Sequence, residues 1–129
     1  MCSSDLTWSP DWHFSEGAFN RTAISFDNPD FVDVVIHSYR HRNGNAPGEG
    51  RFLAVEQQLA QHPKIHVPSI VLYGANDGVA LKLPDSAVDR ALFTSLVARE
   101  VSAAAGHFLP REKPDIVSSA LLKLLENVQ

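Results

Sequence analysis

The sequence predicts an α/β protein in which a mainly helical first half precedes part of a parallel β-sheet. The apolar run Ser69–Tyr73, rich in β-branched residues, is typical of a strand that is buried on both faces. Helix, strand and helix follow it, which is the pattern of parallel strands joined by a helical crossover. Because parallel sheets need several neighbouring strands and covered faces, we expect the sheet to be incomplete in this chain.

Length and composition indicate a soluble globular protein. The chain has 129 residues, 44% apolar and 20% charged, which fits one domain or part of one. A net charge of -4 gives no reason to expect nucleic acid or a membrane surface as a partner. No apolar run approaches the ~20 residues that cross a bilayer. The single cysteine, Cys2, allows no intrachain disulfide, so we expect a cytoplasmic protein.

The first six residues form a separate case. They carry neither the basic region nor the apolar stretch of a secretory signal. The run Cys2–Leu6 resembles the translation of a sequencing adapter, so residues 1–6 are expected to be a non-native leader. The alternative is a short polar N-terminus.

Residues 7–62 are predicted to form a helical segment. Start signals for three helices occur at Ser9-Pro10, Ser15 and Asn28-Pro29-Asp30. The third helix has an apolar stripe containing Tyr39 and is apolar on most of its circumference, so we expect it to be covered on several sides. Gly44 follows its last turn and favours a left-handed cap. A fourth helix is expected over 51–62.

Residues 63–129 are predicted to form the sheet-containing segment. After the first strand we expect a helix from Pro84 to about Leu96 and a second strand from Glu100 to Ala105. The last helix is the clearest, because its apolar residues recur at helical spacing. They are Val117, Ala120, Leu121, Leu124, Leu125 and Val128.

Two residues that could carry chemistry follow the two predicted strands. Asp77 lies in an Asn-Asp-Gly turn after the first, and His107 follows a glycine after the second. Ligands of open α/β sheets bind beyond the carboxyl ends of the strands. Each residue alone is more easily explained as a turn former or a surface residue. Their joint placement favours a pair in which the carboxylate orients a histidine acting as general base.

The residues around Asp77 and around His107 resemble sequence motifs of the α/β-hydrolase family. Residues 65–79, Ile-His-Val-Pro-Ser-Ile-Val-Leu-Tyr-Gly-Ala-Asn-Asp-Gly-Val, look like the family's strand and acid turn. Residues 105–114, Ala-Gly-His-Phe-Leu-Pro-Arg-Glu-Lys-Pro, look like its histidine loop. Acid before histidine is also the family's order for the last two members of the catalytic triad. The resemblance implies the C-terminal part of an α/β-hydrolase fold with Asp77 and His107 as catalytic residues.

The helical segment 7–62 then resembles the cap, or lid, that many members insert before their last two strands. Ile36–Arg40 is similar to the final cap helix of epoxide hydrolases, whose tyrosine donates a hydrogen bond to the epoxide oxygen. This resemblance implies a substrate-binding role for Tyr39, although core packing explains that residue equally well. A second cap tyrosine has no match. Trp8 and Trp12 are candidate substrate-binding residues or, as in haloalkane dehalogenases, halide-binding residues, with ordinary cap packing favoured.

The nucleophile is missing from these motifs. Neither Gly-x-Ser-x-Gly nor Gly-x-Asp-x-Gly occurs in the sequence. We expect an epoxide-hydrolase-like enzyme in its complete form, acting on a small apolar substrate, with the nucleophile in an N-terminal half absent from this chain. Haloalkane dehalogenase and carboxylester hydrolase are the enzymatic alternatives, and an inactive fragment or small binding protein is the non-enzymatic one. As written, the chain is predicted to be inactive.

The remaining polar residues point to no further site. Six histidines without cysteine or carboxylate at ligand spacing argue against zinc, so no metal or cofactor is expected. The cations and histidines at the end of the third helix are interpreted as a solvated helix end. Glu112, between two prolines, is expected to serve the start of the last helix.

Overall fold

The structure is a computed structural model that describes residues 7–80 and 82–127. These residues form two compact units, and each is described by itself. Unit 1 contains the described residues of 1–13 and 63–129, and unit 2 is Phe14–His62. The predicted leader, residues 1–6, lies outside the described residues, as does Val128.

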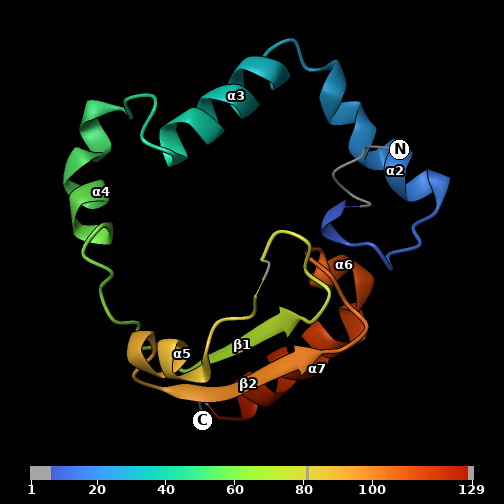
Figure 1. Cartoon of the computed structure of the whole chain (residues 1–129), viewed down its shortest axis with the longest axis vertical. Coiled ribbons are helices and arrows are strands. Elements are labelled where there is room, and N and C mark those ends of the chain that lie inside the picture. Colours follow the sequence, from blue (N-terminus) through green and yellow to red (C-terminus); the bar gives the residue numbers. More distant parts are fainter. Residues whose placement is uncertain (1–6, 81, 128–129) are drawn as a thin grey trace. The chain divides into compact units, whose positions relative to one another are not determined.

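Unit 1 contains the predicted parallel strands (Figure 1). Strand β1 (Ser69–Gly74) pairs in parallel with β2 (Leu96–Ser102), and helix α5 (Ser86–Leu92) connects them. The short helix α6 (Leu109–Glu112) and the longer α7 (Pro114–Glu126) follow. The order strand, helix, strand and helix is as predicted, so an α/β arrangement with a small parallel sheet is confirmed.

The boundaries of the second strand were predicted wrongly. Leu96, expected to end a helix, begins β2, and residues 103–105, expected to be strand, form a turn and loop. Helix α5 stops at Leu92 because Phe93 adopts an extended conformation and forms a bridge with Ile65. Pairing with β1 therefore sets the start of β2, whereas residues 103–105, all alanines, give a strand little side chain to pack.

A buried polar network fixes α5 to the sheet. Asp89 of α5 is 3% exposed. Its carboxylate accepts hydrogen bonds from the Tyr73 hydroxyl of β1 at 2.6 Å and from Arg99 Nε of β2 at 2.7 Å. Arg99 also donates to the Pro84 carbonyl, and its guanidinium lies over the Tyr73 ring. One carboxylate thus connects three elements, and Arg99 supplies its opposite charge.

Helix α7 packs on the sheet with only part of its apolar surface. Ala120 is buried, and Val117 and Leu124 are half-buried. Leu121 and Leu125, which belong to the same predicted stripe, are 56% and 55% exposed. In the part of the chain that the structure describes, α7 is therefore covered along one edge of its apolar face.

Unit 2 consists of helices and connecting loops. It contains α2 (Glu16–Ala23), the 3₁₀ turn η1 (Ile24–Asp27), α3 (Phe31–Arg42), the 3₁₀ turn η2 (Gly50–Phe52) and α4 (Leu53–Leu59). The Ser15 hydroxyl caps α2 by accepting from the Ala18 N–H. Gly44, with φ of 72°, provides the predicted left-handed residue after α3.

Two expectations for the helical segment were wrong. No described helix begins at Ser9-Pro10: residues 9–11 form a bend and turn closed by the Trp12 N–H to Ser9 carbonyl bond, and they belong to unit 1. Within the described residues, α3 is also not covered on several sides. Among the described residues of its apolar stripe, Val32 is 61% exposed and Ile36 51%.

Candidate active site

The two strands bring Asp77 and His107 to the same edge of the sheet. Asp77 follows the end of β1, and His107 follows the end of β2. The loops touch at their base, where the Asn76 N–H donates to the Ala105 carbonyl. A Cβ atom on Gly74 would lie 2.2 Å from the Gly106 carbonyl oxygen, so this approach requires a glycine. The sequence therefore sets the spacing of the loops with glycines as well as with strand register.

The side chains of Asp77 and His107 form a hydrogen-bonded pair. His107 Nδ1 lies 3.1 Å from each carboxylate oxygen of Asp77. The side chains are 36% exposed for His107 and 19% for Asp77. An ionised carboxylate only accepts hydrogen bonds, so Nδ1 carries the proton and Nε2 of the neutral ring has a free lone pair. This is the tautomer that a histidine general base needs.

The surroundings of Asp77 favour its ionised form. Partial burial raises the pKa of this carboxyl, but the hydrogen bond from His107 and the backbone N–H groups of Val79 and Ala80 outweigh it. The pKa of Asp77 therefore lies below its usual value. The backbone bonds, at 2.8 and 3.1 Å, both go to Oδ1. Asp77 is thus a turn former and a partner of histidine at once, and the two interpretations of the sequence do not compete.

Aromatic side chains lie beside the histidine ring. The Trp8 and His107 ring centroids are 5.3 Å apart, and those of Phe108 and His107 are 5.4 Å apart. Trp12 packs against Phe108 at 5.4 Å. The structure thus brings together four of the five predicted site residues, in unit 1. Phe108, which sequence reasoning left unassigned, completes this aromatic group and adjoins His107 in the sequence.

The two loops are held in place by hydrogen bonds to Trp8, Ser9 and Glu112. The Trp8 carbonyl accepts from the N–H groups of Gly78 and His107. Ser9 and Glu112 bond to each other and to the backbone of the histidine loop. The expectation that Glu112 serves the start of α7 was wrong, because α7 has no side-chain cap. No spacing rule links residues 9 and 112, so only the fold could reveal this cluster.

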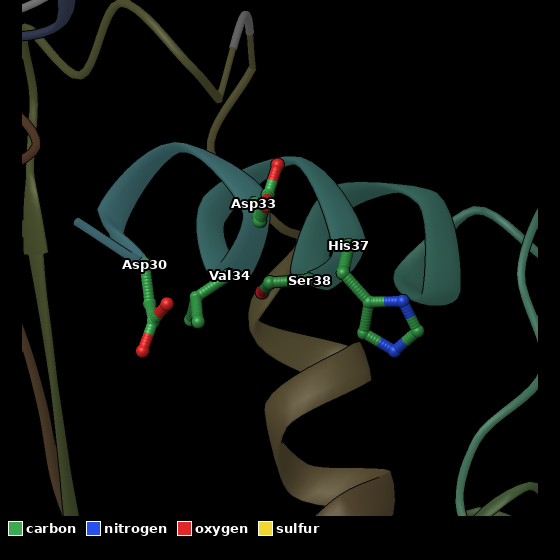
Figure 2. A pocket seen from close by; sticks show the side chains of 5 residues that line it. All are labelled: Asp30, Asp33, Val34, His37 and Ser38. Carbon is green, nitrogen blue, oxygen red and sulfur yellow. The ribbon is translucent and has the colours of Figure 1, made fainter.

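Tyr39, the fifth predicted site residue, lies on α3 in unit 2. Its side chain is 46% exposed, and its carbonyl accepts from the Asn43 amide. A hollow of about 470 Å³ lies against the same helix, lined by Asp30, Asp33, Val34, His37 and Ser38. Figure 2 shows these side chains along the first part of α3 and at the residue before it, Asp30. None of the five was predicted to be functional.

The described residues offer neither a metal-binding cluster nor a membrane-spanning helix. Residues 7–80 and 82–127 contain no group of three or more histidine, cysteine, aspartate or glutamate side chains that could hold a metal ion. No helix in this described part is both long and apolar enough to span a bilayer.

One comparison links this architecture to a known protein. The chain is similar to a Klebsiella pneumoniae protein of known crystal structure described as a "putative epoxide hydrolase", with a TM-score of 0.82 and 40% identity over 92% of this chain. The chain spans 39% of the length of that protein. Comparisons with protein-family models and with curated proteins gave no match. This chain is therefore similar, in sequence and in fold, to part of a protein described as a "putative epoxide hydrolase".

Proposed function

We propose that this chain is the C-terminal part of an α/β-hydrolase that opens epoxides in its complete form. The hydrogen-bonded Asp77–His107 pair at the carboxyl edge of two parallel strands carries the proposal. The likeness to the Klebsiella protein supports it, because 40% identity extends over 92% of this chain. Residues 14–62 would form the cap. Residues 7–13 would belong to the core, with which they form one unit.

The proposed reaction has two steps. A carboxylate supplied from outside this chain attacks an epoxide carbon, the ring C–O bond breaks, the ring oxygen takes the proton of the Tyr39 hydroxyl, and an ester to the enzyme forms. His107 Nε2 then takes a proton from water, and the resulting hydroxide attacks the carbonyl carbon of the ester. The acyl C–O bond of the ester then breaks, and the leaving oxygen of the diol takes up the proton from the imidazolium. The nucleophile is left as a carboxylic acid, which returns its proton to the Tyr39 oxygen and so regenerates both groups. Asp77 stabilises that imidazolium through Nδ1–H.

The substrate is proposed to be small and apolar. Trp8 and Phe108 flank the His107 ring at 5.3 and 5.4 Å, and Trp12 extends this aromatic surface. Aromatic walls with few polar groups are typical of pockets for apolar ligands. Tyr39 would donate a hydrogen bond to the epoxide oxygen as the ring opens. No cofactor is proposed, because the carboxylate, His107, Tyr39 and water account for every bond change between the epoxide and the diol.

Haloalkane dehalogenation is the second candidate, favoured by the contact between Trp8 and His107. An indole N–H is a donor suited to a departing halide. In the epoxide reaction, by contrast, the oxygen needs a proton donor such as the Tyr39 hydroxyl. The two reactions therefore depend on different side chains.

The test uses the complete protein, obtained by extending the gene upstream of this sequence. Turnover of an aryl epoxide, a primary haloalkane and an aryl ester is measured for the wild type, Tyr39→Phe and Trp8→Phe. If epoxide opening is the function, Tyr39→Phe lowers kcat for the epoxide by on the order of 10²-fold, and Trp8→Phe has a smaller effect. Turnover confined to the haloalkane and sensitive to Trp8→Phe would instead establish the dehalogenase. Turnover of the ester alone, or of none of the three, would overturn both candidates.

Residues 1–129 alone are proposed to be inactive, since a base and its orienting carboxylate cannot form the covalent intermediate. The purified chain should hydrolyse none of the three substrates above the rate of its His107→Gln variant. Turnover that depends on His107 would show that a nucleophile is present in this chain after all.

A further inference from the structure

The backbone N–H groups of His107 and of its two sequence neighbours are held by one small cluster. The Gly106 N–H donates to Glu112 Oε2 at 2.9 Å, and the His107 N–H donates to the Trp8 carbonyl at 3.0 Å. The Phe108 N–H donates to Ser9 Oγ and to Glu112 Oε1, both at 3.1 Å. Three consecutive amides of an irregular loop are therefore fixed by Glu112, a few residues further along the chain, and by Trp8 and Ser9, about 100 residues before them.

The cluster is closed by a bond between its two side chains. The Ser9 hydroxyl donates to Glu112 Oε1 at 2.6 Å, and Ser9 is fully buried. Glu112 thus accepts from two backbone amides and one hydroxyl. An ionised carboxylate accepts at both oxygens without donating at either, and charge-assisted bonds of this kind are stronger than neutral ones. In Glu112→Gln the side-chain NH₂ group, itself a donor, would face at least one of the groups that donate to Glu112.

The same segment also reaches the loop of the acid. The Trp8 carbonyl accepts from the N–H of Gly78 at 3.0 Å, next to Asp77, as well as from His107. A Cβ atom on Gly106 would lie 2.6 Å from Ser9 Cα, so the chain segments are in direct contact. The acid loop and the histidine loop are therefore held against a common support.

We propose that Ser9 and Glu112 are positioning residues that hold the His107 ring in register with Asp77. Neither side chain takes part in the bond changes of the reaction. Their role is to fix the backbone from Gly106 to Phe108, which sets the direction of the imidazole and keeps its proton on Nδ1. This inference rests on the proposed function for its catalytic meaning. The geometry that it describes can be measured without any turnover.

The test is the tautomer of His107 in the complete protein. Histidine is labelled with ¹⁵N, and the two-bond ¹H–¹⁵N correlations of the imidazole ring are recorded above the pH at which the ring becomes neutral. The His107→Gln variant identifies the signals, and Asp77→Asn supplies the spectrum of the broken pair. Glu112→Gln and Ser9→Ala are compared with two exposed substitutions on α7, Glu126→Gln and Ser118→Ala.

The wild type and both controls should show His107 protonated at Nδ1. Glu112→Gln and Ser9→Ala should move its signals toward those of Asp77→Asn while the other histidine signals stay in place. If the protein turns over an epoxide, Glu112→Gln should also lower kcat by on the order of 10- to 100-fold with little change in KM, because a misplaced base affects the reaction rather than binding.

Unchanged His107 signals in both folded variants would overturn the proposal. If Glu112→Gln unfolds, Ser9→Ala decides, because it leaves the two bonds from Glu112 to the backbone in place. Unfolding of both would make the cluster a general part of the core and would equally overturn the positioning role. The proposed function can fail separately. In that case the complete protein turns over no epoxide, although Glu112→Gln and Ser9→Ala still move the His107 signals as expected.

Discussion

At the scale of single residues, Asp77 combines an observed structural role with a proposed catalytic one. Its Oδ1 atom closes the turn by accepting from Val79 and Ala80, and both oxygens face His107 Nδ1. The backbone bonds hold the carboxylate in position and favour its charge before any substrate arrives. Such preorganisation is a common source of catalytic electrostatics, because nothing needs to reorient during the reaction.

Replacing Asp77 by asparagine separates these two roles. In the complete protein we expect Asp77→Asn to lower kcat by on the order of 10³- to 10⁴-fold, because the amide does not hold the required tautomer of His107. The amide oxygen can still accept from Val79 and Ala80, so the thermal midpoint should change little. Steady-state kinetics and a melting curve check both parts. Activity within tenfold of the wild type would contradict the catalytic role.

The sequence predicts the Asp77–His107 pair but not the residues that hold its two loops in place. Asp77 and His107 lie within short motifs, and parallel strands bring the ends of such motifs together. Ser9 and Glu112 are brought together by the fold, and Ser9 was read as a helix cap from its neighbour Pro10. Local propensity cannot reveal that a buried hydroxyl has a partner far along the chain. Tyr39 was predicted by resemblance, and its role stays a prediction.

At the scale of elements, the Tyr73–Asp89–Arg99 network holds β1, α5 and β2 together. The hydrogen bond from Tyr73, the largest contribution, lowers the pKa of Asp89; burial opposes it, and Arg99 lowers the pKa further. The apolar pattern predicted these elements, but it did not predict a buried charge among them. It also misplaced the start of β2, because strand pairing over Leu96–Ser102 overrides the local preference for helix.

Two aspartates four residues apart, Asp85 at the N-cap of α5 and Asp89 within it, should differ strongly in their effect on stability. Asp89→Ala leaves Tyr73 and Arg99 without their acceptor, and we expect it to cost about 3–5 kcal/mol. Asp85→Ala removes only the exposed cap that accepts from the Ala87 N–H, and we expect a cost of about 1 kcal/mol. Urea unfolding of the complete protein measures both. Equal costs would show that the network does not anchor α5.

Tyr73 makes the same network sensitive to alkaline pH. Burial, followed by the hydrogen bond and the charge of Asp89, raises the pKa of Tyr73 from 10.0 to about 12, although Arg99 opposes this. The stabilising contribution of the protonated hydroxyl is complete below pH 10 and is lost as the pH rises toward 12, because the unfolded chain releases its proton first. Tyr73→Phe should therefore lose less stability than the wild type between pH 8 and 11. If the free energy of unfolding, measured with urea, falls equally with pH in the wild type and in Tyr73→Phe, the raised pKa of Tyr73 is contradicted.

At the scale of the whole molecule, the described residues leave much apolar surface in contact with solvent. Leu121, Leu122 and Leu125 of α7 are 55–63% exposed, and Val32, Val34 and Ile36 of α3 are 51–62% exposed. The apolar stripes predicted for both helices are present in the structure, but the described residues cover them only in part. The chain spans 39% of the Klebsiella protein, and we propose that residues outside this chain cover these faces in the complete fold.

Residues 1–129 produced alone should therefore associate with one another. Exposed apolar faces and unpaired strand edges favour such association. Sedimentation should show species larger than a 14.2 kDa monomer. The complete protein should not associate through these faces. A monomer of the short chain with a sharp, cooperative melt would contradict the proposed coverage.

Trapping the intermediate tests the central claim most directly. In the complete protein, His107→Gln keeps the nucleophile but removes the base that activates water, so the ester should form and persist. Mass spectrometry of this variant after mixing with an aryl epoxide should show the protein heavier by one substrate molecule, and the wild type should show no lasting adduct. Free turnover by His107→Gln at the wild-type rate, with no adduct, would contradict the assignment of His107 as the base.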